Sequence, residues 1–452
     1  MKLAALVLTG LLAACAPVTL AVPTARALPE AAPGSGPLPF AGPAGPPLRS
    51  NAEMARDILD LAFALEGGRP VAALSRFEGP VRLRVRGPAP PGLGRELSLL
   101  LARLRSEARL PIRQVAADRP AEITVQAVPA AEIARAAPQA ACFVVPEAED
   151  WDDFLRLRGT GALDWARVVR RHRAAVFVPS DAAPQEIRDC LHEEVAQALG
   201  PLNDLWHLPD SVFNDDNVHG TLTGFDMLVL RALNDGALRA GMSRAEVAAR
   251  LPGILARLNP AGEQGDAGPV TRLPVEWARA MEEAHAEAAG PVRRRRAAEA
   301  AVGMARAAGP APRLEGSALL ALGRLQASAE PQEARATFAA AHRAFDRSPA
   351  AALHRAHAAM QLMAFALAEG EPGPVLDLAA EALPVAEAHG NAALAATILL
   401  LRAEALESLG RPAAARAARL DGLARARYGF GRPEAVDARL REVRSLRPVA
   451  LR

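Results

Sequence analysis

The spacing of apolar and polar residues in the first half of the chain mixes two periodicities. Helices are expected where apolar residues recur every three or four positions, and strands where they alternate or run together. The expected helices are 52–65 and 93–105, and the expected strands are 81–85, 123–128, 142–145 (stopped by Pro146) and 174–178. This mixture predicts an α+β domain.

A longer helix is expected at 184–199, ending at Gly200. The segment that follows is rich in Pro, Asn and Asp and is expected to be irregular to about 220. Two more helices should follow, at 223–233 and 243–258. Each opens with the spacing of a capping box, and the second is expected to break at Pro252-Gly253 because proline removes a helical hydrogen bond.

The last part of the chain is rich in Ala and Leu and has no strand pattern. The pairs Glu330-Pro331, Glu371-Pro372 and Arg411-Pro412 recur at spacings of 41 and 40 residues. Proline is tolerated in the first turn of a helix, so each pair predicts the start of the second helix of a hairpin. The pattern resembles a degenerate tetratricopeptide array, with units longer than the usual ~34 residues. An unspecialised helical bundle is the alternative.

These patterns divide the chain into a short N-terminal segment, a tether and two folded domains. Residues 16–48 are crowded with Pro, Gly and Ala and cannot bury enough surface to fold. The α+β domain is expected at 49–260, a linker at 261–274 and the all-α helical-hairpin domain at 275–452.

The first fifteen residues resemble the signal peptide of a bacterial lipoprotein. Lys2 precedes a short apolar run, and Leu12-Ala13-Ala14-Cys15 is similar to a lipobox whose cysteine becomes acylated. An ordinary secretory signal is the alternative. Acylation of Cys15 would hold the protein on a membrane by lipid chains, facing the periplasm, and Ala16 after the cysteine favours the outer membrane.

Cys142 and Cys190 are the cysteines left after Cys15. In a compartment that permits disulfides we expect them to pair, which would stabilise the fold by about 4 kcal/mol. Two buried free thiols are the alternative.

Charge gives little indication of a partner. The formal net charge is +2, so no nucleic-acid partner is expected. The one compact basic run, Arg293 to Arg296, could contact nucleic acid or anionic lipid, but its alanine-rich surroundings favour a solvated helix start.

The segment 193–203, E-E-V-A-Q-A-L-G-P-L-N, has the spacing of the metzincin zinc motif H-E-x-x-H-x-x-G-x-x-H with every histidine replaced. It therefore resembles a zincin-like metalloprotease domain. The resemblance places Glu193, Gln197 and Asn203 at the three metal positions and Glu194 at the general-base position. Gly200 would allow the left-handed turn that brings Asn203 back towards the helix.

The chemistry of these residues is poor for zinc, which prefers imidazole and thiolate. If an ion binds, Ca²⁺, Mg²⁺ or Mn²⁺ is the more natural choice. Alternatively no ion binds, and Gln197 and Asn203 close a hydrogen-bond network with the two glutamates. Two adjacent acids should raise at least one pKa.

The resemblance extends beyond the helix, and its pocket residues are Gly200, Asp204, Ser211 and Phe213. Phe213 would replace the methionine of the metzincin turn as an apolar floor. His192, His207 and His219 are candidate metal ligands, but no register places two of them on one face, so surface or loop positions are expected.

Within Cys190 to Met242, the runs Gly224-Phe225-Asp226-Met227 and Ala240-Gly241-Met242 add a second resemblance. The segment is similar to a family of uncharacterised exported proteins known as domain of unknown function 2927, over roughly residues 60 to 255. This implies location and fold more than chemistry.

Three functions follow as expectations. In the first, the domain binds a peptide or envelope protein without cleaving it, holding an extended chain against a strand edge. In the second, it is a metal-dependent hydrolase with Glu194 as general base. In the third, the domain is a scaffold and the helical repeats carry the function.

Overall fold

The computed structural model describes residues 47, 49–138, 140–264, 274–286, 288–309 and 311–448. The expected signal peptide with Cys15, nearly all of the tether and linker residues 265–273 lie outside them. The described residues form two compact units, an α/β unit within Gly42–Val270 and a helical unit within Thr271–Arg452. No helix among the described residues combines the length and the apolar character that crossing a membrane requires.

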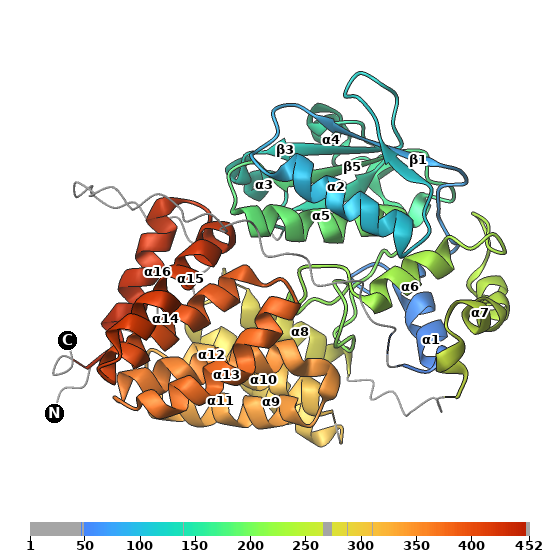
Figure 1. Cartoon of the computed structure of the whole chain (residues 1–452). Helices are drawn as coiled ribbons and strands as arrows, with labels where there is room; N and C mark the ends of the chain where they lie inside the picture. Colours follow the sequence, from blue (N-terminus) through green and yellow to red (C-terminus); the bar gives the residue numbers. More distant parts are fainter. Residues whose placement is uncertain are drawn as a thin grey trace. The chain divides into compact units, whose positions relative to one another are not determined.

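A five-stranded mixed sheet forms the centre of the α/β unit (Figure 1). Its order is β2-β1-β3-β5-β4, with β4 antiparallel to β5 and every other pair parallel. The strands are β1 (Val81–Arg86), β2 (Ile112–Gln114), β3 (Ile123–Val128), β4 (Phe143–Pro146) and β5 (Ala174–Pro179). The expected strands are confirmed, but Pro146 ends β4 inside the strand instead of stopping it beforehand.

Both faces of β5 are covered because the sheet lies between two layers of helices. Ala174, Val176 and Val178 belong to the main core, which also contains the apolar faces of α2 (Leu93–Ser106) and α5 (Pro184–Leu199). Ala175 and Phe177 face the other way, in a smaller aromatic core with residues of α3 (Ala130–Ala136) and α4 (Trp151–Leu157). Side chains alternate across a strand, so a central strand with both faces covered is apolar throughout.

Three helices pack together beside the sheet layers: α1 (Asn51–Ala62), α6 (Gly224–Leu233) and α7 (Arg244–Leu258). The two expected capping boxes are present, at Thr223 and Ser243, and a third, not expected, lies at Ser50. The expected break in the last helix was wrong, because α7 continues through Pro252. Pro252 and Gly253 are exposed, so water can satisfy the carbonyl that loses its donor.

Several short elements were not expected from the sequence. Strand β2 has only three residues and helices α3 and α4 have seven each, too few for a periodic pattern to emerge. Helix α1 ends at Ala62 rather than at residue 65, because Leu65 and Gly68 form a tight turn in which the amide of Gly68 donates to the carbonyl of Leu65. Short 3₁₀ turns lie at 161–163, 165–167 and 260–264.

The helical unit is a succession of helices with short connections. They are α8 (Val275–His285), α9 (Pro291–Ala307), α10 (Pro312–Gln326), α11 (Pro331–Asp346), α12 (Ala352–Ala368), α13 (Pro372–Ala388), α14 (Ala392–Ser408), α15 (Pro412–Phe430) and α16 (Pro433–Ser445), with a 3₁₀ turn at 349–351. Four hairpins, α8–α9 to α14–α15, have the largest contacts. An all-helical C-terminal region is thereby confirmed.

The three repeated prolines begin the second helix of consecutive hairpins, as expected. Pro331, Pro372 and Pro412 are the first residues of α11, α13 and α15. Within the α10–α11 hairpin, two glycines seven residues apart face two phenylalanines seven residues apart. A Cβ on Gly316 would lie 2.6 Å from the Phe345 ring, and one on Gly323 would lie 2.8 Å from Phe338, so the small residues let the helices approach closely.

Candidate functional site

Helix α5 carries the motif residues and is held near its middle by a disulfide and at its C-terminus by a buried arginine. Cys190 forms a disulfide with Cys142, one residue before β4, as expected. Most of α5 is buried, with Leu191 and Val195 inaccessible to solvent. The motif side chains are therefore positioned by a packed helix joined covalently to the edge of the sheet.

The C-terminus of α5 is capped by a buried arginine that the sequence did not indicate. The Arg171 guanidinium donates to the carbonyls of Gln197, Ala198 and Gly200 at 2.7, 2.6 and 2.7 Å, and to Ser75 Oγ at 3.1 Å. Burial lowers the pKa of Arg171 to about 9, so it keeps its charge at neutral pH. A cation at this position complements the negative end of the helix dipole.

Gly200 does not adopt the left-handed conformation that the motif suggested. Its φ is −179°, an extended backbone open to any residue. Glycine is needed for packing instead, because a Cβ would lie 2.9 Å from Leu233 Cδ1 on α6. The expected turn was wrong because the close contact with α6 sets the path of the chain.

The three expected metal positions do not share one hydrogen-bond network. Asn203 Nδ2 donates to the Asp60 carbonyl on α1 at 3.1 Å, which uses the amide that would have turned towards α5. Gln197 Nε2 instead faces Asp204 Oδ2 at 3.4 Å, a long hydrogen bond. The residue brought back to the helix is Asp204, one position beyond the expected one.

Carboxyl groups crowd around this contact. Burial raises the pKa of Glu194 well above its usual range, and Asp204 and Glu66 raise it further. The pKa of Asp204 is raised in the same direction by burial and then by Glu193, Glu66 and Asp215, with Gln197 as its one opposing hydrogen bond. Burial and then Glu194 likewise raise the pKa of Glu193. The raised pKa expected for the adjacent acids is present.

Two oxygens of this cluster are buried without a hydrogen-bond partner. They are Glu194 Oε2 and Asp204 Oδ1, and Glu194 is only 5% exposed. Glu193 is half-buried and Glu66 is exposed, so these two side chains form a rim that solvent reaches. A buried unpaired carboxylate is costly, so such groups take up a proton or a cation.

Asp226 fixes the turn that contains Ser211 and Phe213. Its carboxylate accepts from Ser211 Oγ at 2.5 Å, Val212 N at 3.2 Å and Thr223 N at 2.8 Å. Burial raises the pKa of Asp226 to about 6 against these hydrogen bonds. Phe213 is fully buried, and its carbonyl accepts from the amide of Leu205. The capping-box acid therefore also connects this turn to α6.

The three candidate histidines lie apart and have other roles. His192 is buried rather than on the surface, and its Nδ1 accepts from the amide of Leu222 at 3.0 Å. Burial keeps the pKa of His192 well below its usual range. His207 Nε2 lies 2.8 Å from Asp57 Oδ1, and His219 Nε2 lies 3.0 Å from the carbonyl of Pro209.

The donor set does not fit zinc. The motif positions supply one carboxylate and two amides, and Asn203 is engaged with α1. Across the described ranges, no three His, Cys, Asp or Glu side chains converge in a way that could hold a metal ion by themselves. Zinc needs imidazole or thiolate at such a site, so no zinc chemistry is assigned here.

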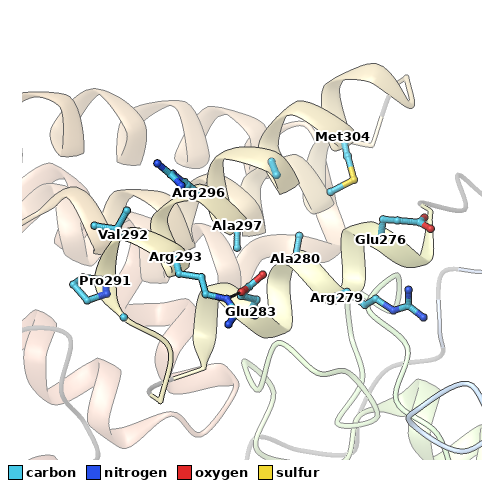
Figure 2. A pocket seen from close by; sticks show the side chains of 12 residues that line it. Glu276, Arg279, Ala280, Glu283, Pro291, Val292, Arg293, Arg296, Ala297 and Met304 are labelled. Carbon is cyan, nitrogen blue, oxygen red and sulfur yellow. Dashed lines mark hydrogen bonds and ion pairs between the residues drawn. The ribbon is translucent and has the colours of Figure 1, made fainter.

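The helical unit has a groove of its own, of about 900 Å³, between α8 and α9 (Figure 2). Its walls alternate charged side chains with small or apolar ones: Glu276, Arg279, Ala280, Glu283, Gly290, Pro291, Val292, Arg293, Arg296, Ala297, Ala300 and Met304. The basic run Arg293–Arg296 lies in the first turns of α9, where Arg293 pairs with Glu283 and Arg295 with Glu299 and Glu330.

Sequence reasoning missed Arg171 and Glu66 and gave Asp204 a minor place. Arg171 follows another arginine in an irregular segment, and no local pattern marks it as buried. Glu66 had one available signal, because Glu66-Gly67-Gly68 after an amphipathic helix is typical of a tight turn. The turn places that carboxylate beside α5.

No curated protein and no solved structure matches this chain. Residues 51–253 match the model of the family described as "Protein of unknown function (DUF2927)", which confirms the family resemblance over the α/β unit that carries the site.

Proposed function

We propose that the α/β unit is a zincin-like domain without zinc ligands, which binds a peptide or envelope protein without cleaving it. The observation that carries the proposal is the position of Asn203. Its side-chain amide donates to the main chain of α1, whereas that of Gln197 faces Asp204, so the two amides are held by different partners. The motif spacing and the placement of α5 directly after the interior strand β5 support the zincin-like fold.

The surroundings of Glu194 disfavour its ionised form, which bears on the hydrolase alternative. A general base must be ionised to take a proton from water. Burial and two nearby carboxyls hold the pKa of Glu194 well above its usual range, which favours the protonated form. The alternative function, a metal-dependent hydrolase with Glu194 as base, therefore requires a bound cation.

The main chain of β4 has few free groups with which to pair a partner's strand, although β4 is at the edge of the sheet. The carbonyl of Val144 accepts from Trp165 Nε1 at 3.4 Å, and that of Pro146 accepts from the amide of Ala148. Pro146 also has no N–H to donate. The binding surface we propose is therefore the acidic rim, Glu66 and Glu193, rather than the main chain of β4.

The proposal includes a lipid anchor at Cys15 that holds the protein in the cell envelope, facing the periplasm, with the outer membrane favoured over the inner. The lipobox-like sequence supports this anchor. The Cys142–Cys190 disulfide supports an oxidising compartment.

The test combines capture and hydrolysis with the full chain. We expect the chain to capture a protein from envelope extract and to cleave no peptide of a mixed library. The double variant Glu66→Gln, Glu193→Gln should lose the captured protein, whereas Asp118→Asn, an exposed carboxylate in the β2–β3 loop, should retain it. Peptide hydrolysis that requires stoichiometric metal and disappears in Glu194→Gln would establish the hydrolase instead.

A scaffold role for the helical unit is the second candidate, favoured by the α8–α9 groove. If this unit carries the function, deletion of the residues beyond Gly268 abolishes capture and the rim variant leaves it unchanged. The opposite result assigns capture to the α/β unit.

A further inference from the structure

The buried carboxyl cluster of the α/β unit contains more negative groups than its surroundings neutralise. The groups that act on Glu194 are Asp204 and Glu66, both acidic. Those that act on Asp204 are acidic too, apart from the amide of Gln197. An uncompensated charge at such depth is unstable unless something positive joins it.

Two oxygens in the cluster lack the hydrogen-bond partners that buried carboxylates normally have. Glu194 Oε2 and Asp204 Oδ1 are both buried, and neither has a hydrogen-bond partner. They come from α5 and from the segment after it, and Gln197 lies between them in sequence with its Nε2 turned to the other oxygen of Asp204. The side-chain oxygen of Gln197, Oε1, is thereby left as a third acceptor.

We propose that Glu194, Gln197 and Asp204 form a binding site for a hard divalent cation, Ca²⁺. This site differs from the motif positions: it uses Glu194 in place of Glu193 and Asp204 in place of Asn203. Carboxylate and amide oxygens are the ligands that Ca²⁺ takes, in flexible geometry. Mg²⁺ is disfavoured because it retains several waters, for which a buried pair of oxygens leaves little room.

The small number of protein oxygens at the site limits its affinity for Ca²⁺. Two carboxylates and one amide supply fewer oxygens than the six to eight that Ca²⁺ takes, in agreement with the lack of a three-acid cluster among the described residues. We expect a dissociation constant of about 10⁻⁴–10⁻³ M, the range of extracellular calcium modules. The site would then be filled only where Ca²⁺ reaches such concentrations.

The test is calorimetric titration of CaCl₂ into the full chain, freed of metal with chelator at pH 7.5. We expect binding that Glu194→Gln and Asp204→Asn each weaken about tenfold or more. The exposed control Asp118→Asn should retain it, with circular dichroism to show that each variant folds. MgCl₂ should bind more weakly.

Absence of binding up to ~10 mM CaCl₂, far above the expected dissociation constant, would overturn the proposal. Binding that persists in both Glu194→Gln and Asp204→Asn would also overturn it, as would tighter binding of Mg²⁺. The inference concerns the same site as the proposed function, but no partner is present in the titration. Its failure would therefore leave the capture of an envelope protein untouched, and failed capture would not affect the titration.

Discussion

Substitution of Arg171 by methionine tests whether one buried cation holds the motif helix in place. Methionine keeps an apolar stem and removes four hydrogen bonds from a charged donor. Such bonds contribute about 1.5–3 kcal/mol each, roughly 9 kcal/mol together. Burial of the charge opposes this, because the fall in pKa from 12.5 to about 9 corresponds to about 5 kcal/mol. We expect a net loss of about 4 kcal/mol.

Hydrogen exchange of the α5 amides at increasing urea measures this loss in the full chain, separately from the helical unit. A loss of about 4 kcal/mol corresponds to roughly thousandfold faster exchange in water. Arg171→Lys should fall between wild type and Arg171→Met, since an ammonium keeps the charge but cannot span the same acceptors.

Arg170→Met is the matched control, because Arg170 is the neighbouring residue and is exposed. It should change the free energy of unfolding by less than about 0.5 kcal/mol. If Arg171→Met costs no more than this control, the capping role of Arg171 is refuted.

Three further changes test other parts of the α/β unit. The folded state binds the Asp226 proton more tightly than the unfolded chain, so this group should lower the free energy of unfolding by about 3 kcal/mol as pH rises from below 3.8 to above 6. In urea titrations at several pH values, the fall should be about 3 kcal/mol larger in the wild type than in Asp226→Asn, which keeps the contributions of Glu193, Glu194 and Asp204. Replacing Cys142 and Cys190 by alanine should lower the free energy of unfolding by about 4 kcal/mol, since the bridge spans 48 residues, and an unchanged urea midpoint would contradict it. Gly200→Ala should cost about 1–3 kcal/mol through the contact with Leu233, and its effect should be smaller in a chain that already carries Leu233→Ala.

Much of the fold was predictable because its long elements bury one face. The six-residue strands β1, β3 and β5 show the apolar patterns of a sheet, and the helices α6 and α7 begin where their capping boxes predict. The short elements β2, α3 and α4 were missed because they depend on contacts with the sheet rather than on a local pattern.

The sequence predicted the helix that carries the candidate site, but not all of the residues that form the site. The motif spacing located Glu193, Glu194 and Gln197 on α5. It did not indicate that Asn203 hydrogen-bonds to α1 or that Gly200 packs on α6, and both contacts direct the following segment. Those neighbours are far apart in sequence, so no spacing rule contains them.

The sequence by itself determined the two units, the hairpin starts, the cystine partners and the helix that carries the acids, because each is set by periodicity, local capping or the number of cysteines. Only the tertiary structure decided that Asp204 faces Gln197, that Glu66 joins the cluster and that Arg171 caps α5. The reason is physical: electrostatic and hydrogen-bond partners are chosen by distance in space, and chain folding brings together residues that no local pattern connects.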